Sequence, residues 1–293
     1  MLKAIQAELY KLFKNRTFKV LICVAVLLST LTVVMCSSVF EKILNDSLGN
    51  MPQDQKEVLM EQLTSMSESE AIVTPGQLGI QLQAKDMMNP TSIEVYHASF
   101  GSGVIEIIIG ILVGALIAKE YSQGTIKNFL AYGKRREEFY LAKFVSMVIA
   151  VTIILAVMTI LPTIVVTLMN GWRQAFEISQ LLGMIKTFVA SVIAGSAVAA
   201  LAMIIATLVK SNGATIGITV AIFIGIPTLA GFLYGIYPWF DRVYEVLPFY
   251  NSALATSIKA GNGDLLRSVI ISLVTIAISL FVGIKIFKSQ DIK

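Results

Sequence analysis

Long apolar runs alternate with shorter polar connections along most of the chain. A membrane-spanning helix needs about 20 consecutive, mainly apolar residues, and six segments reach about that length. They are residues 18–40, 98–118, 144–169, 182–209, 214–237 and 266–287. The pattern therefore predicts an all-α polytopic membrane protein with six transmembrane helices.

The N-terminal lead, residues 2–17, follows a helical period instead of a continuous apolar run. Lysines surround apolar positions that recur three or four residues apart: Leu2, Ile5, Leu9, Leu12 and Phe13. This spacing predicts an amphipathic helix lying in the membrane interface. The alternative is a simple cytoplasmic extension of the first span.

The connection between the first two runs, residues 41–97, is long and polar. A short helix is predicted over residues 54–66, and Pro52, Pro75 and Pro90 break the rest into turns. Too few large apolar residues are present to build a separate core. We therefore expect a small extracytoplasmic cap on a single domain that spans residues 1–293.

Composition agrees with a membrane protein, and the placement of basic residues gives its orientation. Apolar residues make up 56% of the chain and charged residues 14%, against about 25% charge in soluble domains. The mean hydropathy is +0.76. Lys and Arg gather in the lead and in residues 119–143, whereas residues 41–97 hold three lysines against nine acids. Because positive loops stay inside, both termini are predicted to be cytoplasmic.

The sequence lacks the residues of a catalytic, metal or cofactor site. His97 is the only histidine, and no thiol or carboxylate clusters with it as a metal site requires. No G-x-x-x-x-G-K-[ST] phosphate loop occurs. The basic run Lys134-Arg135-Arg136 is too short to indicate nucleic acid, and two acids follow it at once. We expect no enzyme activity, and any ATP-driven step needs a separate ATPase chain.

Glu106 is the clearest ionisable residue inside a predicted span. It lies 12 residues from Ala118, so about 18 Å from the inner edge of the membrane. A carboxylate at that depth is costly and indicates a functional site. Substrate contact, proton uptake and a structural hydrogen bond to a neighbouring helix remain equally open readings.

Two prolines fall inside predicted spans. Proline removes a backbone hydrogen bond and kinks a helix. Pro227 and the glycines after it predict that the fifth span breaks or re-enters before the outer surface, and Pro162 predicts a bend in the third span.

Small residues recur every four positions in several spans, as in Gly110 and Gly114 of the second span and Gly213 and Gly217 of the fifth. Such faces let helices approach closely. They serve either packing inside one subunit or a subunit interface, and the sequence does not separate the two.

The connection at residues 119–143 carries the most specific pattern. Residues 120–127 read Glu120-Tyr121-Ser122-Gln123-Gly124-Thr125-Ile126-Lys127, and Arg135-Arg136 and Phe139-Tyr140-Leu141-Ala142-Lys143 follow. This pattern resembles the ABC-2 type permease family, the transmembrane subunits of type V ABC exporters. The resemblance extends to the six-span layout, and it is closest to the bacitracin-resistance, lantibiotic-immunity and sodium-efflux group. Residues 41–97 are longer than the first outer loop of many small immunity permeases, which leaves the substrate class open.

The resemblance implies a bacterial cytoplasmic-membrane protein that docks onto a cytoplasmic nucleotide-binding subunit. Residues 124–132 would form the coupling helix, and ATP and Mg would bind only to the partner. A second permease subunit, identical or different, would complete the exporter. The implied docking residues are Glu120, Gly124, Thr125, Ile126, Lys127, Phe129, Leu130 and Tyr132.

The leading hypothesis is therefore a permease subunit that exports an amphipathic or lipid-like substrate, such as a membrane-active antimicrobial peptide. The permease itself would contact membrane lipid. Two other classes stay open. One is a non-transport membrane sensor or an immunity protein that sequesters a peptide. The other is an ion-coupled secondary transporter that uses Glu106, although such a transporter should show internal repeats and several intramembrane charges.

Overall fold

The computed structural model of the chain describes residues 1–37, 46, 49, 51–52, 55, 58, 71–84, 86, 89–125 and 135–290. Over these residues the fold is helical, and the β structure they contain is one isolated bridge between Gly79 and Ser102. Most of residues 54–66, where a short helix is predicted, and residues 126–134 lie outside the described part.

Five helical runs among the described residues are long and apolar enough to cross a membrane. Large apolar side chains on their outer faces, such as Leu27, Leu168 and Phe281, are exposed. An apolar exterior of this extent suits a lipid environment. The chain is a multi-pass membrane protein, as its sequence predicts. The five runs are α2 (Arg16–Met35), α9 (Arg136–Asn170), α10 (Ile178–Val209), Asn212–Gly231 and α15 (Asn262–Ser289).

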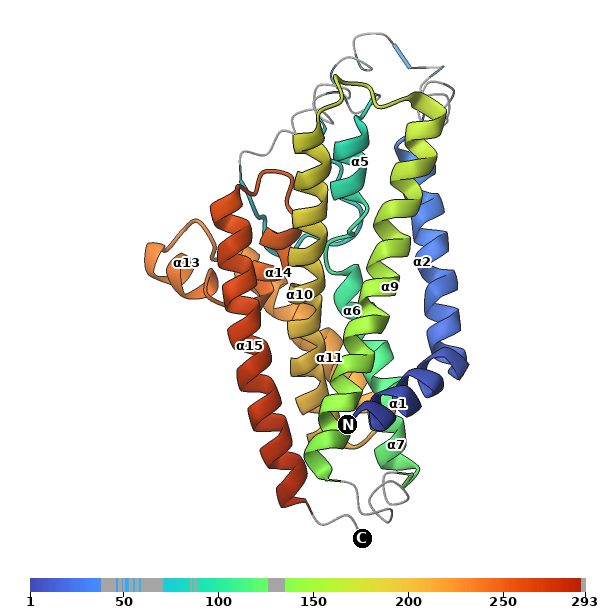
Figure 1. Ribbon diagram of the computed structural model, residues 1–293. Coiled ribbons are helices and arrows are strands. Elements are labelled where there is room, and N and C mark those ends of the chain that lie inside the picture. Colours follow the sequence, from blue (N-terminus) through green and yellow to red (C-terminus); the bar gives the residue numbers. More distant parts are fainter. Residues whose placement is uncertain are drawn as a thin grey trace.

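The long helices stand side by side in a bundle (Figure 1). α10 packs against both α9 and α15, and α2 packs against α9. Figure 1 also places both termini at one end of this bundle, which we call the α1 end. The opposite end, called the α5 end, carries the short helix α5 (Ser92–Ala98).

The predicted N-terminal helix is present as α1 (Leu2–Lys14), and it is separate from α2. Asn15 makes the break: its backbone is extended, and its side chain accepts hydrogen bonds from the amides of Thr17 and Phe18 at 2.7 and 3.3 Å. An Asn in this position satisfies the free N–H groups at the start of a helix. The chain can therefore turn sharply, and α1 lies across the end of the bundle (Figure 1).

The second predicted span, residues 98–118, is broken instead of continuous. α5 ends at Ala98, and helix resumes only at α6 (Val104–Val113), which leads into the π-helical turn η1 (Gly114–Ala118) and α7 (Lys119–Ser122). Gly101 and Gly103 have φ of 62° and 72°, a left-handed conformation that suits glycine and interrupts a helix. The six predicted spans are thus five long helices and one broken segment.

The fifth predicted span, residues 214–237, ends early. It comprises α11 (Asn212–Val220), the π-helical turn η2 (Ala221–Gly225) and α12 (Ile226–Gly231). After Gly231 the chain turns into α13 (Pro238–Tyr244) and α14 (Pro248–Thr256). Figure 1 shows α13 at the side of the bundle beside α15. The predicted break therefore falls six residues before residue 237.

The described part of the polar connection, residues 71–84, packs onto the bundle as a strap. The Ser257 hydroxyl donates to the Ile72 carbonyl at 2.6 Å, and the Gly79 amide donates to the Ser102 carbonyl at 2.8 Å. Val73 joins a buried aromatic cluster with Tyr244 and Tyr250. The strap is thereby fixed across the bundle and covers the N-terminal end of α6.

Candidate functional site

Four charged side chains meet at the α1 end, where the sequence pattern of residues 119–143 begins and ends. The Lys143 ammonium lies 2.7 Å from Glu120 and 2.5 Å from Glu8 of α1. Lys11 contacts the same two carboxylates, Glu8 at 2.8 Å and Glu120 at 3.2 Å. We call Glu8, Lys11, Glu120 and Lys143 the charge cluster, and it joins α1, α7 and α9.

Burial divides the charge cluster into an inner and an outer pair. The side chains of Glu8 and Lys143 are 2% and 3% exposed, whereas those of Glu120 and Lys11 are 18% and 47% exposed. A buried charge is tolerated when it is paired and hydrogen-bonded. Lys143 also donates to the Leu116 carbonyl in the π-helical turn η1 at 3.3 Å. Removing a member of the inner pair, Glu8 or Lys143, should therefore reduce stability more than removing a member of the outer pair.

Lys11 stays charged at the rim of the cluster. Burial works to lower the pKa of its ammonium, but the hydrogen bonds and electrostatic attraction of Glu8 and Glu120 outweigh burial and raise the pKa above its ordinary value. Its charge is therefore retained throughout the neutral range.

Gly124 ends α7. It has φ of 67°, its amide donates to the Tyr121 carbonyl, and the next amide, of Thr125, donates to the Glu120 carbonyl. These two bonds form a Schellman motif, for which glycine is the usual residue. The Thr125 hydroxyl turns back to the Glu120 carbonyl at 3.4 Å. Gly124 and Thr125 therefore terminate α7 with a turn in the chain.

The returning end of the connection is fixed to α15. Arg136 donates from one guanidinium nitrogen to the carbonyls of Phe287, Lys288 and Gln290 at 3.1, 2.8 and 2.7 Å. Glu137 and Lys288 form an ion pair beside it. Phe287 is fully buried against aromatic rings from both ends of the connection, Tyr121, Phe139 and Tyr140. Both ends of residues 126–134 are thus anchored to the bundle.

A cavity of about 290 Å³ lies against the charge cluster. All four cluster residues line it, together with Gln123 and Thr125 at the start of the connection. The charge cluster therefore borders this cavity at the end of α7.

Glu106 forms a second polar point, inside the bundle. Its Oε1 accepts a hydrogen bond from Ser252 at 2.8 Å, and its side chain is 9% exposed. Its Oε2 is buried and has no hydrogen-bond partner among the described residues. Glu106 also lines a cavity of about 40 Å³, together with Pro227 and part of the strap.

The two prolines predicted to kink spans occupy different settings. Pro227 is the second residue of α12 and follows the π-helical turn η2 directly. Pro162 is buried inside α9, which remains one helix as far as Asn170. Pro227 therefore marks a change in helix geometry, whereas α9 runs through Pro162.

Comparison with known proteins assigns the chain to a protein family. Residues 57–293 match the sequence profile of a family described as "Protein of unknown function (DUF2705)". The chain belongs to the DUF2705 family. A search among curated proteins finds no match. The region shared with DUF2705 holds Glu106, Glu120 and Lys143, whereas α1 with Glu8 and Lys11 precedes it.

The structure of this DUF2705 chain places only part of the predicted docking set. Glu120 lies in the charge cluster, and Gly124 and Thr125 lie at the end of α7. The remaining predicted docking residues lie outside the described part of the chain: Ile126, Lys127, Phe129, Leu130 and Tyr132.

Sequence reasoning missed the partners of Glu120. Glu8 shares a buried face with Ala4 and Leu12 at four-residue spacing. An acid on the apolar face of the predicted amphipathic helix is therefore the sequence signal that indicates a buried charged partner for Glu8. Lys143 closes the sequence pattern, but no role was predicted for it. The pairing of residues 135 positions apart has no local signature in a single sequence.

Proposed function

We propose that this chain is the transmembrane permease subunit of an ATP-driven ABC exporter, energised by a separate nucleotide-binding subunit. Residues 124–132 act as the coupling helix that contacts this partner, and ATP and Mg bind to the partner alone. A second permease subunit, a copy or a different chain, completes the transporter in a bacterial cytoplasmic membrane.

The anchoring of both ends of residues 126–134 carries this proposal. Glu120 and Lys143 join the connection to α1 through Glu8, and Arg136 joins it to α15. A force applied to residues 126–134 is therefore passed to α1, α9 and α15 together. That is the arrangement a docking element needs if a partner's motion is to move the bundle.

The layout of the bundle supports the proposed orientation. α1, α7, the start of α9 and the end of α15 lie at one end of the bundle (Figure 1), and these elements carry the basic residues Lys3, Lys11, Lys119 and Arg136. Positive residues stay on the cytoplasmic side. With the broken segment at residues 98–118 counted as a sixth span, both termini face the cytoplasm.

An apolar groove supports an amphipathic or lipid-like substrate. It lies between the α5 ends of α9 and α10, has a volume of about 430 Å³, and its lining includes Ile164, Leu168, Trp172 and Phe188. Ligand pockets for apolar molecules have volumes of about 300–1,000 Å³. The groove can accept the apolar part of such a substrate.

A glycine face on the fifth helical run supports a second subunit. Among the described residues, none lies within 4 Å of where a side chain would project from Gly213, Gly217 or Gly225, whereas Gly110 and Gly114 pack against Thr219 and Ile216 of α11. Packing inside the subunit therefore accounts for the small residues of the second span. The glycines of the fifth helical run remain free to contact another helix.

Affinity capture from native membranes tests the proposal. The tagged wild-type chain should recover a protein with a phosphate-loop motif, identified by mass spectrometry, and the variant Phe129→Ala should lose most of it. Lys186→Ala is the matched control, because Lys186 contacts Asn262 outside the docking connection.

Two results would count against the proposed function. Recovery of no such ATPase from wild-type membranes would favour the sensor, immunity-protein or secondary-transporter classes. Full recovery by Phe129→Ala would remove residues 124–132 as the docking element.

A further inference from the structure

We propose that Glu106 binds a primary ammonium group that reaches it from the α5 end through two adjoining cavities. That this ammonium group belongs to the transported substrate rests on the proposed function. The cation site itself rests only on the residues around Glu106.

The two oxygens of the Glu106 carboxyl group differ in their hydrogen bonding. Ser252 donates to Oε1 at 2.8 Å, whereas Oε2 is buried without a partner among the described residues. An ionised carboxylate in such a setting is costly unless a cation pairs with it. The carboxyl group therefore carries a proton until a cation arrives.

The inner cavity beside Glu106 suits a cation. Its lining includes three aromatic rings, those of Phe223, Tyr244 and Phe249, and Phe223 and Phe249 meet edge to face at 5.2 Å. The faces of aromatic rings attract ammonium groups electrostatically. Carboxylate and rings together supply the two contacts that distinguish an ammonium from a neutral polar group.

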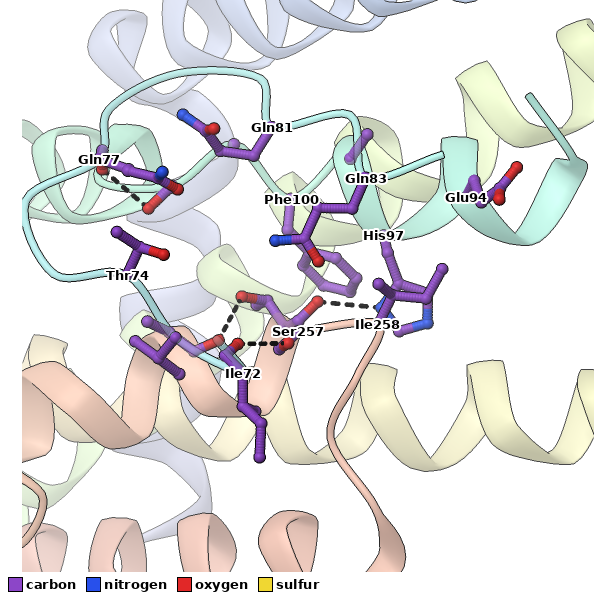
Figure 2. A pocket seen from close by; sticks show the side chains of 16 residues that line it. Ile72, Thr74, Gln77, Gln81, Gln83, Glu94, His97, Phe100, Ser257 and Ile258 are labelled. Atoms are coloured by element: carbon purple, nitrogen blue, oxygen red, sulfur yellow. Dashed lines mark hydrogen bonds between the residues drawn. The ribbon is translucent and has the colours of Figure 1, made fainter. Parts of the chain in front are cut away.

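A second cavity, of about 70 Å³ and lined mainly by polar groups, lies beside the first. Figure 2 shows the side chains that line it: Gln77, Gln81 and Gln83 come from the strap, His97 comes from α5, and Ser257 follows α14. The two cavities share five lining residues and therefore adjoin: Val73, Thr74, Gln77, Ser102 and Ala253.

The charges along this route favour cations. Its titratable lining groups are Glu94, His97, Glu106 and Tyr244, and neither Lys nor Arg is among the described residues that line it. His97 contacts the Thr256 carbonyl through Nδ1 at 2.9 Å, which assigns the ring proton to Nδ1. Arg267, from α15, is paired with Glu245 at 3.1 Å. No described cation along the route therefore competes for Glu106.

The size of the cavities limits the ligand. Inner and outer cavities of about 40 and 70 Å³ can hold a few water molecules, since one water needs about 10–15 Å³. A primary ammonium on a narrow chain fits this space, whereas a quaternary ammonium is too wide and donates no hydrogen bond to Oε2.

Binding exchanges a proton for the ammonium ion. The O–H bond of Glu106 breaks, its proton passes to water as hydronium, and the carboxylate that remains pairs with the ammonium. No other bond changes, and charge in the site is conserved. Each bound ammonium therefore releases one proton.

Proton release from the purified full-length chain tests this inference. Ethylammonium chloride added to the wild-type chain in weakly buffered detergent should release protons saturably, up to one per chain, read with a pH-sensitive dye. Infrared difference spectra should show loss of a protonated carboxyl band. Tetramethylammonium chloride should give neither signal.

Variants assign the signal to Glu106. Glu106→Gln should abolish the response, because the released proton comes from the Glu106 carboxyl group. Glu177→Gln should keep it, because Glu177 is an exposed carboxylate at the start of α10. Circular dichroism checks that both variants fold.

Absence of saturable release by the wild-type chain overturns the inference whatever the variants do. An unchanged response in folded Glu106→Gln overturns it as well. The measurement uses neither ATP nor a partner chain, so its outcome is independent of the affinity capture that tests the proposed function.

Discussion

Lys143 and Lys11 contact the same two carboxylates, yet their surroundings give them different weight. The Lys143 side chain is 3% exposed and that of Lys11 is 47% exposed. Exposed ion pairs contribute at most about 1 kcal/mol, whereas removing one partner of a buried pair costs about 3–5 kcal/mol. Burial therefore decides which of the two lysines holds the charge cluster together.

Lys143→Met should lower the free energy of unfolding by about 3–5 kcal/mol, because it leaves the Glu8 carboxylate buried without its closest cation. Lys11→Met should lower it by less than about 1 kcal/mol. Denaturant or thermal unfolding in one detergent measures both. Equal losses of unfolding free energy in the two variants would show that the inner pair has no special role. Adding Glu8→Gln to Lys143→Met should restore part of the lost stability.

Gly124→Ala should destabilise the chain by about 1–2 kcal/mol, since a side chain at positive φ is strained. Gly213→Ala is the matched control, because Gly213 has open space around it and is not among the glycines with positive φ. The same unfolding measurement checks this prediction, which fails if the two alanines have the same effect.

At the scale of elements, the end of α15 depends on a side chain from α9. Arg136 satisfies three carbonyls at this helix end, which otherwise have no partner within the helix. The link joins the first residue of α9 to the end of α15.

Arg136→Gln should increase amide hydrogen exchange in the last turn of α15, with little change in its middle. Arg135→Gln is the control, because Arg135 is exposed next to Arg136. Hydrogen–deuterium exchange read by mass spectrometry gives the comparison. Equal exchange in both variants would remove Arg136 as the group that holds this end.

Sequence pattern predicts the long helices well, because a run of about 20 apolar residues has few other uses. It predicts α1 from its spacing of apolar residues. It fails at Gly101 and Gly103, since glycine is common in membrane helices and only the structure shows their positive φ. It also fails at Glu8 and Lys143, whose pairing depends on how α1 folds back over α9.

At the scale of the whole molecule, α11 and η2 present a glycine face that the described residues leave uncovered. Gly213 and Gly217 of α11 and Gly225 of η2 have no described neighbour within 4 Å of where a side chain would project. The proposed second permease subunit gives this face a use, since small residues allow close approach of two helices.

Gly217→Cys, in a chain whose two cysteines, Cys23 and Cys36, are replaced by serine, should form a covalent dimer with a short thiol cross-linker in native membranes. Ile278→Cys should not, although Ile278 is exposed on α15. Gel electrophoresis with and without reductant reads the result. A heterodimer gives a cross-link to a different chain, and no cross-link from position 217 would exclude α11 as the seam.

Contact between residues 124–132 and a nucleotide-binding subunit is the central claim, and site-specific photo-cross-linking measures it most directly. A photoreactive phenylalanine analogue at position 129 should capture a protein with a phosphate-loop motif in intact membranes, and the same group at position 233, between α12 and α13, should not. Capture of that protein from 129 alone is the predicted result. No capture from 129, or equal capture from both positions, would contradict the account.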